Sequence, residues 1–210
     1  MPSSSRTNLL TRPAGAAAPA GDGRHARSQS SRARIVAAML ELVGQGDVQP
    51  SAARVAETAG VGLRTVFRHF DDMEALYREL SEAIEARVLP ILLKPFVAPE
   101  WRGRIREMAE RRTELFEAIL PFRISASLKR FQSSFLMRDY RRMLRLERET
   151  IDMVLPPEIL ADPVRANMVY CALNFQSWRS LRHDMELEVA VARAVFLATV
   201  DAVLAAIPEG

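Results

Sequence analysis

The chain has 210 residues, of which 49% are hydrophobic, and a formal net charge of +3. This composition is that of a folded protein with a substantial core, and it excludes a largely disordered chain. No apolar run approaches the roughly 18 residues that a membrane span needs, and residues 1–31 lack the apolar core of a signal peptide. The single cysteine, Cys171, excludes an intrachain disulfide and a cysteine-based metal set. We therefore expect a cytoplasmic protein with no membrane partner.

The positive charge is concentrated at the N-terminal end. Residues 1–70 hold nine arginines and four acidic residues, a net charge of +5, whereas the remaining residues hold 20 basic and 22 acidic residues, a net charge of −2. A basic surface binds nucleic acid because counterions are released from the phosphates. The asymmetry favours a nucleic-acid partner for the N-terminal third, since an ordinary solvated surface would not sort its charges in this way.

The first segment, residues 1–31, is rich in Ser, Ala, Pro, Gly and Arg and poor in large apolar residues. It buries too little surface to offset its ordering entropy, so we predict a disordered basic arm. Basic residues gather near its end: Arg24, His25, Arg27, Arg32 and Arg34. They either lie along phosphates or in a minor groove, or belong to a mobile tail that adds solubility.

The segment 51–70, SAARVAETAGVGLRTVFRHF, has the pattern of a helix-turn-helix. Ser51 is a good N-cap for a first short helix, and Gly60 suits a turn with positive φ. Val66 and Phe70 face inward from the second helix, over 63–69. The candidate DNA-binding residues are Ser51, Gly62, Leu63, Arg64, Thr65, Phe67, Arg68 and His69.

The side chains of the second helix suggest separate roles on DNA. Arg64 is long enough for a bidentate contact to guanine, and Thr65 can offer its methyl group to thymine or its hydroxyl to a base or phosphate. Arg68 and His69 are better placed for phosphates, which fix the register without reading sequence.

Residues 35–77 resemble the DNA-binding domain of the tetracycline-repressor (TetR) family. The resemblance rests on Val55-Ala56, Ala59-Gly60-Val61, the run from Thr65 to Phe70 (TVFRHF), and Glu74-Ala75-Leu76. It implies a three-helix DNA-binding domain over 32–77 and a helical ligand-binding and dimerisation domain over 78–210. It also implies that a tilt of the helix after the motif changes the separation of two recognition helices.

Three positions depart from the pattern of that family. Gly62 stands where the family usually has Ser or Thr, Phe67 where it usually has Tyr, and Met73 where it often has Lys. Each departure removes a polar contact to the DNA backbone, so we expect weaker sequence-independent affinity. Arg64 and the basic arm are the groups that would compensate.

The rest of the chain has the apolar periodicity of amphipathic helices. No strand-like alternation extends over a useful length, which predicts an all-α fold. Pro121 is expected to kink or restart a helix. With the helix that opens the DNA-binding domain, the predicted helices span 32–43, 73–89, 100–120, 122–131, 135–155, 163–182 and 187–207.

Aromatic and sulfur-containing side chains in the middle helices suit an adaptable apolar pocket, although residues at this spacing are more often plain core. The candidate ligand-binding residues are Met108, Arg112, Phe116, Phe122, Phe131, Phe135, Tyr140 and Met143. Arg112 lies on an otherwise apolar helix side, where it serves either an internal salt bridge or an acidic ligand.

The last two predicted helices are apolar around more of their circumference than packing on one side requires. In the TetR family the corresponding pair forms a four-helix bundle with a second subunit, so we expect a homodimer. The candidate interface residues are Leu173, Trp178, Val191, Phe196, Val200 and Val203. Cys171 is expected to be a small buried apolar residue.

Catalysis has little support in the sequence. The three histidines are dispersed without ligand spacing, and neither a phosphate-binding Gly loop nor a nucleophile elbow is present, so we expect no enzyme, metal site or cofactor. The favoured hypothesis is a dimeric repressor that a small apolar effector releases from a palindromic operator. The alternative is a helical dimer that acts as a low-specificity DNA-binding, architectural or protein-interaction module.

Overall fold

The structure, a computed structural model, describes residues 22–208, with side chains from residue 28 onward. All regular elements in this range are helical, which confirms the predicted all-α class. In chain order they are α1 (Asp22–Gly44), α2 (Ala52–Thr58), α3 (Leu63–His69), α4 (Met73–Leu92), α5 (Trp101–Lys129), α6 (Ser134–Asp152), α7 (Pro157–Leu160), α8 (Pro163–Leu173), α9 (Phe175–Arg179), a π-helical turn (Ser180–Asp184) and α10 (Val189–Ala206).

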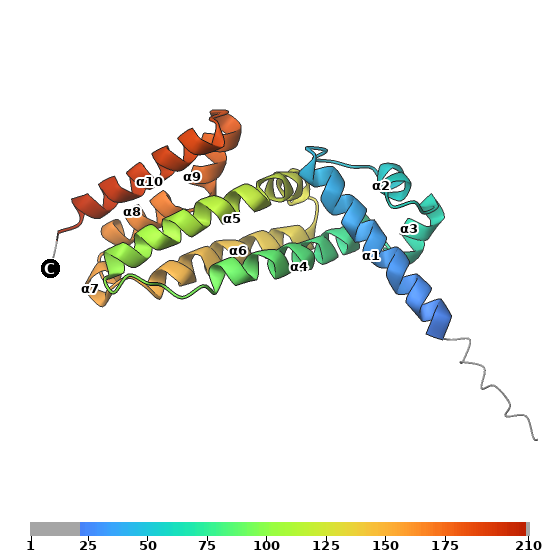
Figure 1. The fold of residues 1–210 in the computed structure, drawn as a ribbon, viewed down its shortest axis with the longest axis horizontal. Helices are drawn as coiled ribbons and strands as arrows, with labels where there is room; N and C mark the ends of the chain where they lie inside the picture. Colours follow the sequence, from blue (N-terminus) through green and yellow to red (C-terminus); the bar gives the residue numbers. More distant parts are fainter. Residues whose placement is uncertain (1–21, 209–210) are drawn as a thin grey trace, which may run out of the picture.

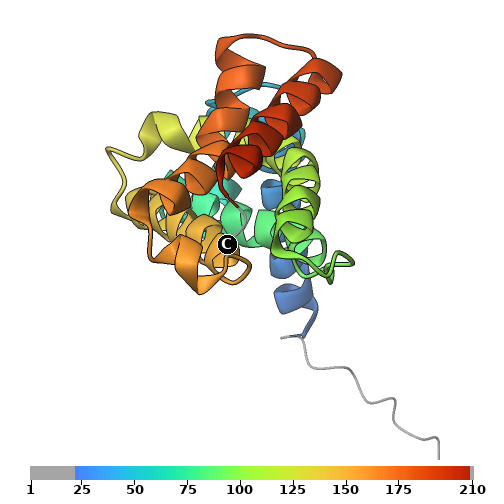
Figure 2. The ribbon, with the colours of Figure 1, turned by 90° about the vertical axis from the view of Figure 1, so that its left-hand side faces the viewer.

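The helices form an elongated molecule (Figure 1). The helices α4, α5 and α6 run along its long axis, and α1, α2 and α3 form one end. The helices α8 and α10 pack against each other, and α10 also packs along α5, at the opposite end (Figures 1 and 2). The predicted helix-turn-helix thus lies at one tip, far from the C-terminal helices.

Local chemistry sets the geometry of the helix-turn-helix. The Ser51 hydroxyl accepts a hydrogen bond from the Arg54 amide at 3.2 Å, as predicted for the N-cap of α2. Gly60 has φ of +61°, which confirms the predicted turn conformation. Val66 and Phe70 are both buried, so the short helices pack on α1 through the residues that the sequence indicated.

The helix α1 is longer than predicted. It begins at Asp22, so the part of the predicted disordered arm over 22–31 is helical; residues 1–21 lie outside the described range. An acidic residue favours the helix start, and each residue added to an existing helix forms one further hydrogen bond. Ile35 and Met39 are buried in the core and stabilise the helix to which residues 22–31 add further turns. The helix thus begins ten residues before residue 32, and the predicted start was wrong.

Two clusters of buried side chains stabilise the fold, and α4 contributes to both. Leu76 and Leu80 belong to the cluster formed with α1, α2 and α3, which we call the N-terminal cluster. Ile84 packs against both clusters, and Val88 packs against the second, which we call the C-terminal cluster. The hydroxyls of Tyr77 and Ser125 are hydrogen-bonded at 3.1 Å in a buried contact between α4 and α5.

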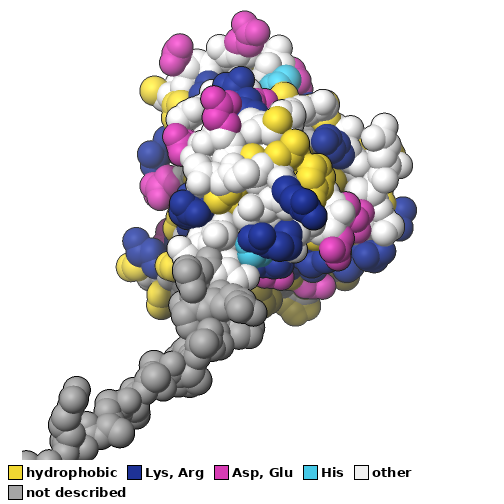
Figure 3. All heavy atoms as spheres, turned by 90° about the vertical axis from the view of Figure 1, so that its right-hand side faces the viewer, with side chains coloured by type: hydrophobic (Ala, Val, Ile, Leu, Met, Phe, Trp, Pro, Cys, Tyr) yellow, Lys and Arg dark blue, Asp and Glu magenta, His cyan; other side chains and the backbone are white. Residues whose placement is uncertain are grey.

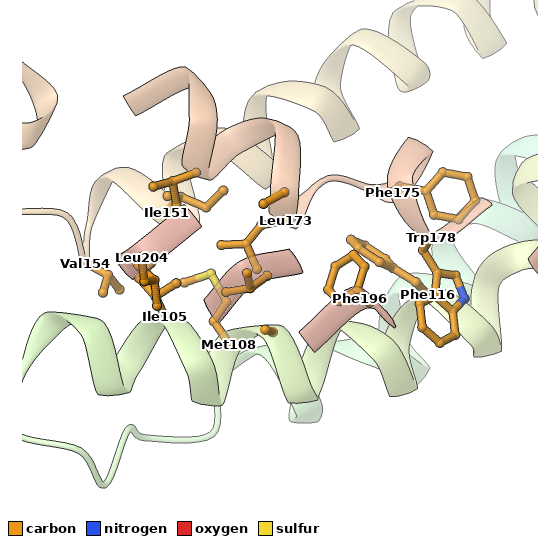
Figure 4. Packing of buried hydrophobic residues seen from close by; sticks show 14 of the residues in the cluster. Ile105, Met108, Phe116, Ile151, Val154, Leu173, Phe175, Trp178, Phe196 and Leu204 are labelled. Atoms are coloured by element: carbon orange, nitrogen blue, oxygen red, sulfur yellow. The ribbon is translucent and has the colours of Figure 1, made fainter. Parts of the chain in front are cut away.

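Aromatic residues gather on one side of the C-terminal cluster (Figure 4). Phe116 lies edge-on to Phe175 and Phe196, with ring centroids 5.5 and 6.4 Å apart, and Trp178 lies edge-on to Phe196 at 5.7 Å. Edge-to-face pairs of this kind add about 0.5–1.5 kcal/mol each to the free energy of burial. The Trp178 indole donates to the Glu117 carboxylate at 3.1 Å, so its one polar atom is paired.

Two predicted helix boundaries in this half were wrong. The helix α5 continues through Pro121, because packing of Ile119 and Phe122 on either side outweighs the loss of a single backbone hydrogen bond at proline. The predicted helix 163–182 is instead broken at Asn174, which has extended backbone and accepts a hydrogen bond from the Ser177 amide at 2.8 Å. Asparagine often competes with helix hydrogen bonding in this way.

Gly60 provides a test of the turn. The Gly60→Ala variant should unfold about 1–2 kcal/mol more easily, because a residue with a Cβ is strained at positive φ. No steric clash adds to this cost, since the nearest atom to such a Cβ is 4.0 Å away on Arg34. Chemical denaturation measures the change.

Gly62→Ser is the matched control for this variant, because Gly62 has an ordinary φ of −71°. Serine at this N-cap should leave the free energy of unfolding unchanged or raise it by a few tenths of a kcal/mol. Equal destabilisation by both variants would contradict the role given to the turn at Gly60.

Candidate DNA-binding surface and effector cavity

The helix α3 presents one face to solvent at the tip of the molecule. Leu63 is 45% exposed and Phe67 52% exposed, and Arg64 and Arg68 are exposed beside them. Thr65 is half-buried on the same helix. Figure 3 views this end of the molecule and shows Lys and Arg side chains gathered across it. The structure therefore brings together the second-helix residues that the sequence singled out.

The residues at the starts of the two short helices differ in their hydrogen bonding. The Ser51 hydroxyl already caps α2, so any phosphate contact would have to share it. Gly62 is the N-cap of α3 and provides no side-chain cap, which agrees with the expected loss of a hydroxyl. The first turn of α3 is thus held by packing and backbone hydrogen bonds.

Arg32 holds the end of α3 in place. Its Nη1 donates to the His69 carbonyl oxygen at 2.7 Å, and its Nε donates to the Glu79 carboxylate of α4 at 2.6 Å. Its guanidinium also lies over the Phe70 ring, 4.6 Å from the centroid. The sequence suggested Arg32 for phosphates or a minor groove, but these contacts make it a link between α1, α3 and α4. Arg32 lies one turn before the buried Ile35 and therefore on the same side of α1. This spacing was the feature of the sequence that could have indicated a structural role.

The surroundings of His69 disfavour a positive charge on its imidazole ring. Burial lowers its pKa, and the positive charges of Arg68 and Arg32 lower it further. Its Nε2 atom is buried and has no hydrogen-bond partner among the described residues. A phosphate would therefore have to be held mainly by Arg68 on this part of α3.

A cavity of about 350 Å³ lies between α4, α5, α6 and α9. Its volume is within the range of small-molecule sites. Three of the predicted ligand-binding residues line it: Phe122, Tyr140 and Met143. Ile84 and Val88 of α4 form another part of its apolar wall, so the helix that follows α3 also borders the cavity.

The other predicted ligand-binding residues lie outside this cavity. Met108 and Phe116 are buried in the C-terminal cluster, because their face of α5 packs against α10 and α9. Phe131 is 77% exposed just beyond the end of α5. Phe135 packs against the N-terminal cluster, beneath the Arg78 guanidinium. Helical spacing identified apolar faces but could not tell which faces are filled by the chain itself.

Arg112 also lies outside the cavity and has a structural role. Its guanidinium donates to the carbonyl oxygens of Leu173 and Glu147, both at 2.7 Å, and to the Thr150 hydroxyl at 2.8 Å. Burial lowers its pKa to about 10, so it stays protonated at neutral pH. The acceptors are neutral oxygens, so these contacts are neither the internal salt bridge nor the acidic-ligand contact considered from the sequence.

The charged groups of the cavity wall were not predicted from the sequence. Arg123, Arg130 and Arg179 line it, together with Glu85 and Asp139. Burial raises the pKa of the Asp139 carboxyl. The spacing of Arg123 and Arg130, seven residues apart and therefore on one helix face beside Phe122, was the signal that could have revealed them.

Four of the predicted dimer-interface residues are in the core of the single chain: Leu173, Trp178, Phe196 and Val200. The α5, α8 and α10 helices of the same chain cover them. Val191 is 50% exposed, and Val203 is partly buried.

A shallow groove on α8 and α10 is the apolar surface left open nearby. It is lined by Met168, Val195, Ala198, Thr199, Ala202, Val203 and Ala206. Cys171 is exposed on α8, which contradicts the expectation that it is buried. By length and composition alone α10 could cross a membrane, although Arg193 and Asp201 interrupt its apolar sequence, and 22% of it is buried in the chain.

No family model matches the chain, and no curated protein matches it significantly. Solved structures resemble it in fold. A transcriptional regulator from Rhodococcus sp. Rha1 matches with a TM-score of 0.61 and 14% identity, over 84% of this chain and 99% of that one. A putative TetR-family transcriptional regulator from Mesorhizobium loti MAFF303099 matches with a TM-score of 0.50 and 16% identity, over 86% of this chain and 98% of that one. The chain thus has the fold of these regulators.

Replacing Arg112 tests its structural role. Arg112→Met should lower the free energy of unfolding by about 1–3 kcal/mol, because the buried Leu173 carbonyl loses its charged donor. Arg106→Met on the same helix is the control, because the Arg106 side chain is 53% exposed and pairs only with the exposed Asp201. The control should change stability by less than about 0.5 kcal/mol. Equal stability of the two variants in urea would refute the structural role.

Proposed function

We propose that this chain is a TetR-type transcriptional regulator, a dimeric repressor that a small molecule bound in the α4–α6 cavity releases from DNA. One observation carries the proposal: only three residues separate the recognition helix α3 from α4, and α4 continues along the wall of the cavity. A ligand there acts on the helix that positions the DNA-binding end. The fold shared with solved transcriptional regulators supports the same conclusion.

In the proposed complex, α3 enters the major groove. Arg64, exposed on its leading turn, contacts a guanine with two parallel hydrogen bonds, and Thr65 contacts a neighbouring base or phosphate. Arg68 contacts a phosphate and fixes the register. The exposed Phe67 ring packs against sugar or a thymine methyl group, since it lacks a hydroxyl to donate.

A second copy covers the groove on α8 and α10. The groove is lined mostly by small apolar side chains, which allow close helix approach, and exposed Val191 and Val164 extend its apolar surroundings. A second copy explains the apolar exterior of α10 without a membrane, in a cytoplasmic protein. A twofold dimer presents two α3 helices to successive major grooves, about 34–36 Å apart, and so favours a palindromic operator.

Release follows from linkage between the two sites. Ser81 of α4 donates to the Asp139 carboxylate of α6 at 3.4 Å, and Arg142 of α6 contacts both Asp139 and Glu85 of α4. These contacts lie beside the cavity, so a ligand that fits better when α4 has shifted favours a dimer whose α3 helices are misplaced for the operator. Differential affinity for the two arrangements is sufficient to release DNA.

DNA titrations over a range of salt concentrations test the proposal. The protein should prefer a palindrome from upstream of its own gene to a scrambled duplex at every salt concentration. Equal affinity for both would reject the specific repressor and favour the alternative, a low-specificity DNA-binding or interaction module.

Arg64→Ala should weaken binding to the preferred palindrome by about 1–3 kcal/mol and leave scrambled DNA nearly unaffected. Arg106→Ala removes the same charge at the far end of α5 and is the control. An unchanged preference in the Arg64 variant would eliminate Arg64 as a base-reading residue.

The dimer surface has its own test. Ala202→Glu places a charge in the α8–α10 groove and should convert the dimer to a monomer in light scattering, with loss of palindrome affinity. Ala205→Glu is the matched control, because Ala205 is exposed on α10 but does not line the groove. A dimer that survives Ala202→Glu would place the interface elsewhere.

A further inference from the structure

We propose that the effector is an amphipathic organic acid, whose carboxylate binds Arg130 at the cavity wall and whose apolar body lies among Ile84, Val88, Phe122 and Met143. This inference rests on the proposed function for its biological meaning and narrows the ligand class. The sequence predicted an apolar effector. The arginines of the cavity wall add the requirement that the effector also carries a negative charge.

The first observation is a set of buried donors without acceptors. The Nη2 of Arg123, the Nε of Arg130 and the Nε of Arg179 are each buried and form no hydrogen bond among the described residues. All three arginines line the same cavity. A buried unpaired donor costs about 1–3 kcal/mol, and buried polar groups in native proteins are nearly always paired. These unpaired donors all belong to residues of one cavity wall, so an acceptor on a ligand at this wall would supply what the chain itself does not provide.

The second observation distinguishes Arg130 from its neighbours. Arg123 pairs with Glu147 at 2.6 Å, and Arg179 pairs with Asp184 at 3.1 Å. Arg130 forms no ion pair with any described residue; its guanidinium lies over the Tyr140 ring, 4.3 Å from the centroid. Stacking on an aromatic face leaves the edge of the guanidinium free for hydrogen bonds. A carboxylate matches that edge with two parallel hydrogen bonds.

The acidic residues of the wall do not neutralise Arg130. Glu85 and Asp139 both contact Arg142, and Asp139 also accepts from Ser81 at 3.4 Å. Their charge is therefore engaged by groups other than Arg130. The rest of the wall is largely apolar, which limits the ligand to one small charged head and an apolar body in about 350 Å³.

Matched pairs of ligands test the charge requirement. The full-length protein is titrated by calorimetry, without DNA, with octanoate, 4-phenylbutyrate and 2-naphthoate and with their primary amides. Each amide keeps the shape of its acid and removes the charge. At least one acid should bind, with an affinity at least tenfold higher than that of its amide. Amides that bind as tightly as the acids would overturn the inference. If none of the acids binds, the inference is also overturned, because water would then satisfy the donors.

Variants locate the carboxylate. Arg130→Gln should reduce acid binding at least tenfold and remove the preference over the amide, whereas Arg141→Gln, on the exposed face of α6, should bind like the unchanged protein. Thermal melting checks that both variants fold. Because the acid–amide comparison uses the unchanged protein, misfolding of one variant does not remove the test. Equal losses in both variants would contradict the assignment to Arg130.

A separate measurement distinguishes this inference from the proposed function. Acids that bind in calorimetry are added to the protein–DNA complex. Acid binding without release of DNA would refute the ligand-responsive repressor and leave the charge requirement intact. Release by an amide but not by its acid would refute the charge requirement and support the repressor.

Discussion

The fold depends on α4 being packed into two cores at once. Leu76 and Leu80 belong to the N-terminal cluster, and Val88 packs against the C-terminal cluster. The N-terminal half of α4 is buried, and its later turns pack against the C-terminal cluster through the half-buried Ile84 and Val88, so a shift of the helix requires repacking of side chains in both clusters. The buried hydrogen bond between Tyr77 and Ser125 adds a directional constraint near the N-terminal end of α4. In the proposed function, this shared helix couples the end that carries α3 to the shape of the cavity.

Arg32 extends the same constraint to the recognition helix. It joins the last carbonyl of α3 to Glu79 on α4 and covers Phe70, so a rotation of α4 is transmitted to α3 through charge-assisted hydrogen bonds as well as through the chain. Such bonds are directional, whereas apolar packing alone permits sliding. The short link between α3 and α4, anchored by the Asp72 cap at 2.8 Å, completes a compact connection. The two helices therefore move as one unit in the proposed mechanism.

The sequence predicted what depends on local pattern. Helical class, the Gly60 turn and the buried Val66 and Phe70 follow from period and from backbone preferences, and all were correct. Pattern failed where tertiary packing decided the outcome, as in the continuation of α5 through Pro121. Trp178 and Phe196 are buried in the core of their own chain, and an apolar helix face has the same sequence signature whether its own chain or a second copy covers it. The arginines of the cavity wall were not predicted as ligand-binding residues, because isolated charged residues on helices usually face solvent.

The three departures from the TetR pattern differ in their structural cost. Met73 is half-buried and packs against the N-terminal cluster, so restoring lysine there would remove apolar contacts as well as add a charge. Gly62 has ordinary backbone angles, and a Cβ there would meet only the Thr65 hydroxyl at 4.0 Å. Phe67 is more than half exposed. Serine at 62 and tyrosine at 67 would thus fit the fold unchanged. The fold does not require either residue, whereas Met73 contributes apolar packing, so a change to the family pattern at position 73 has a cost in stability that changes at 62 and 67 do not have.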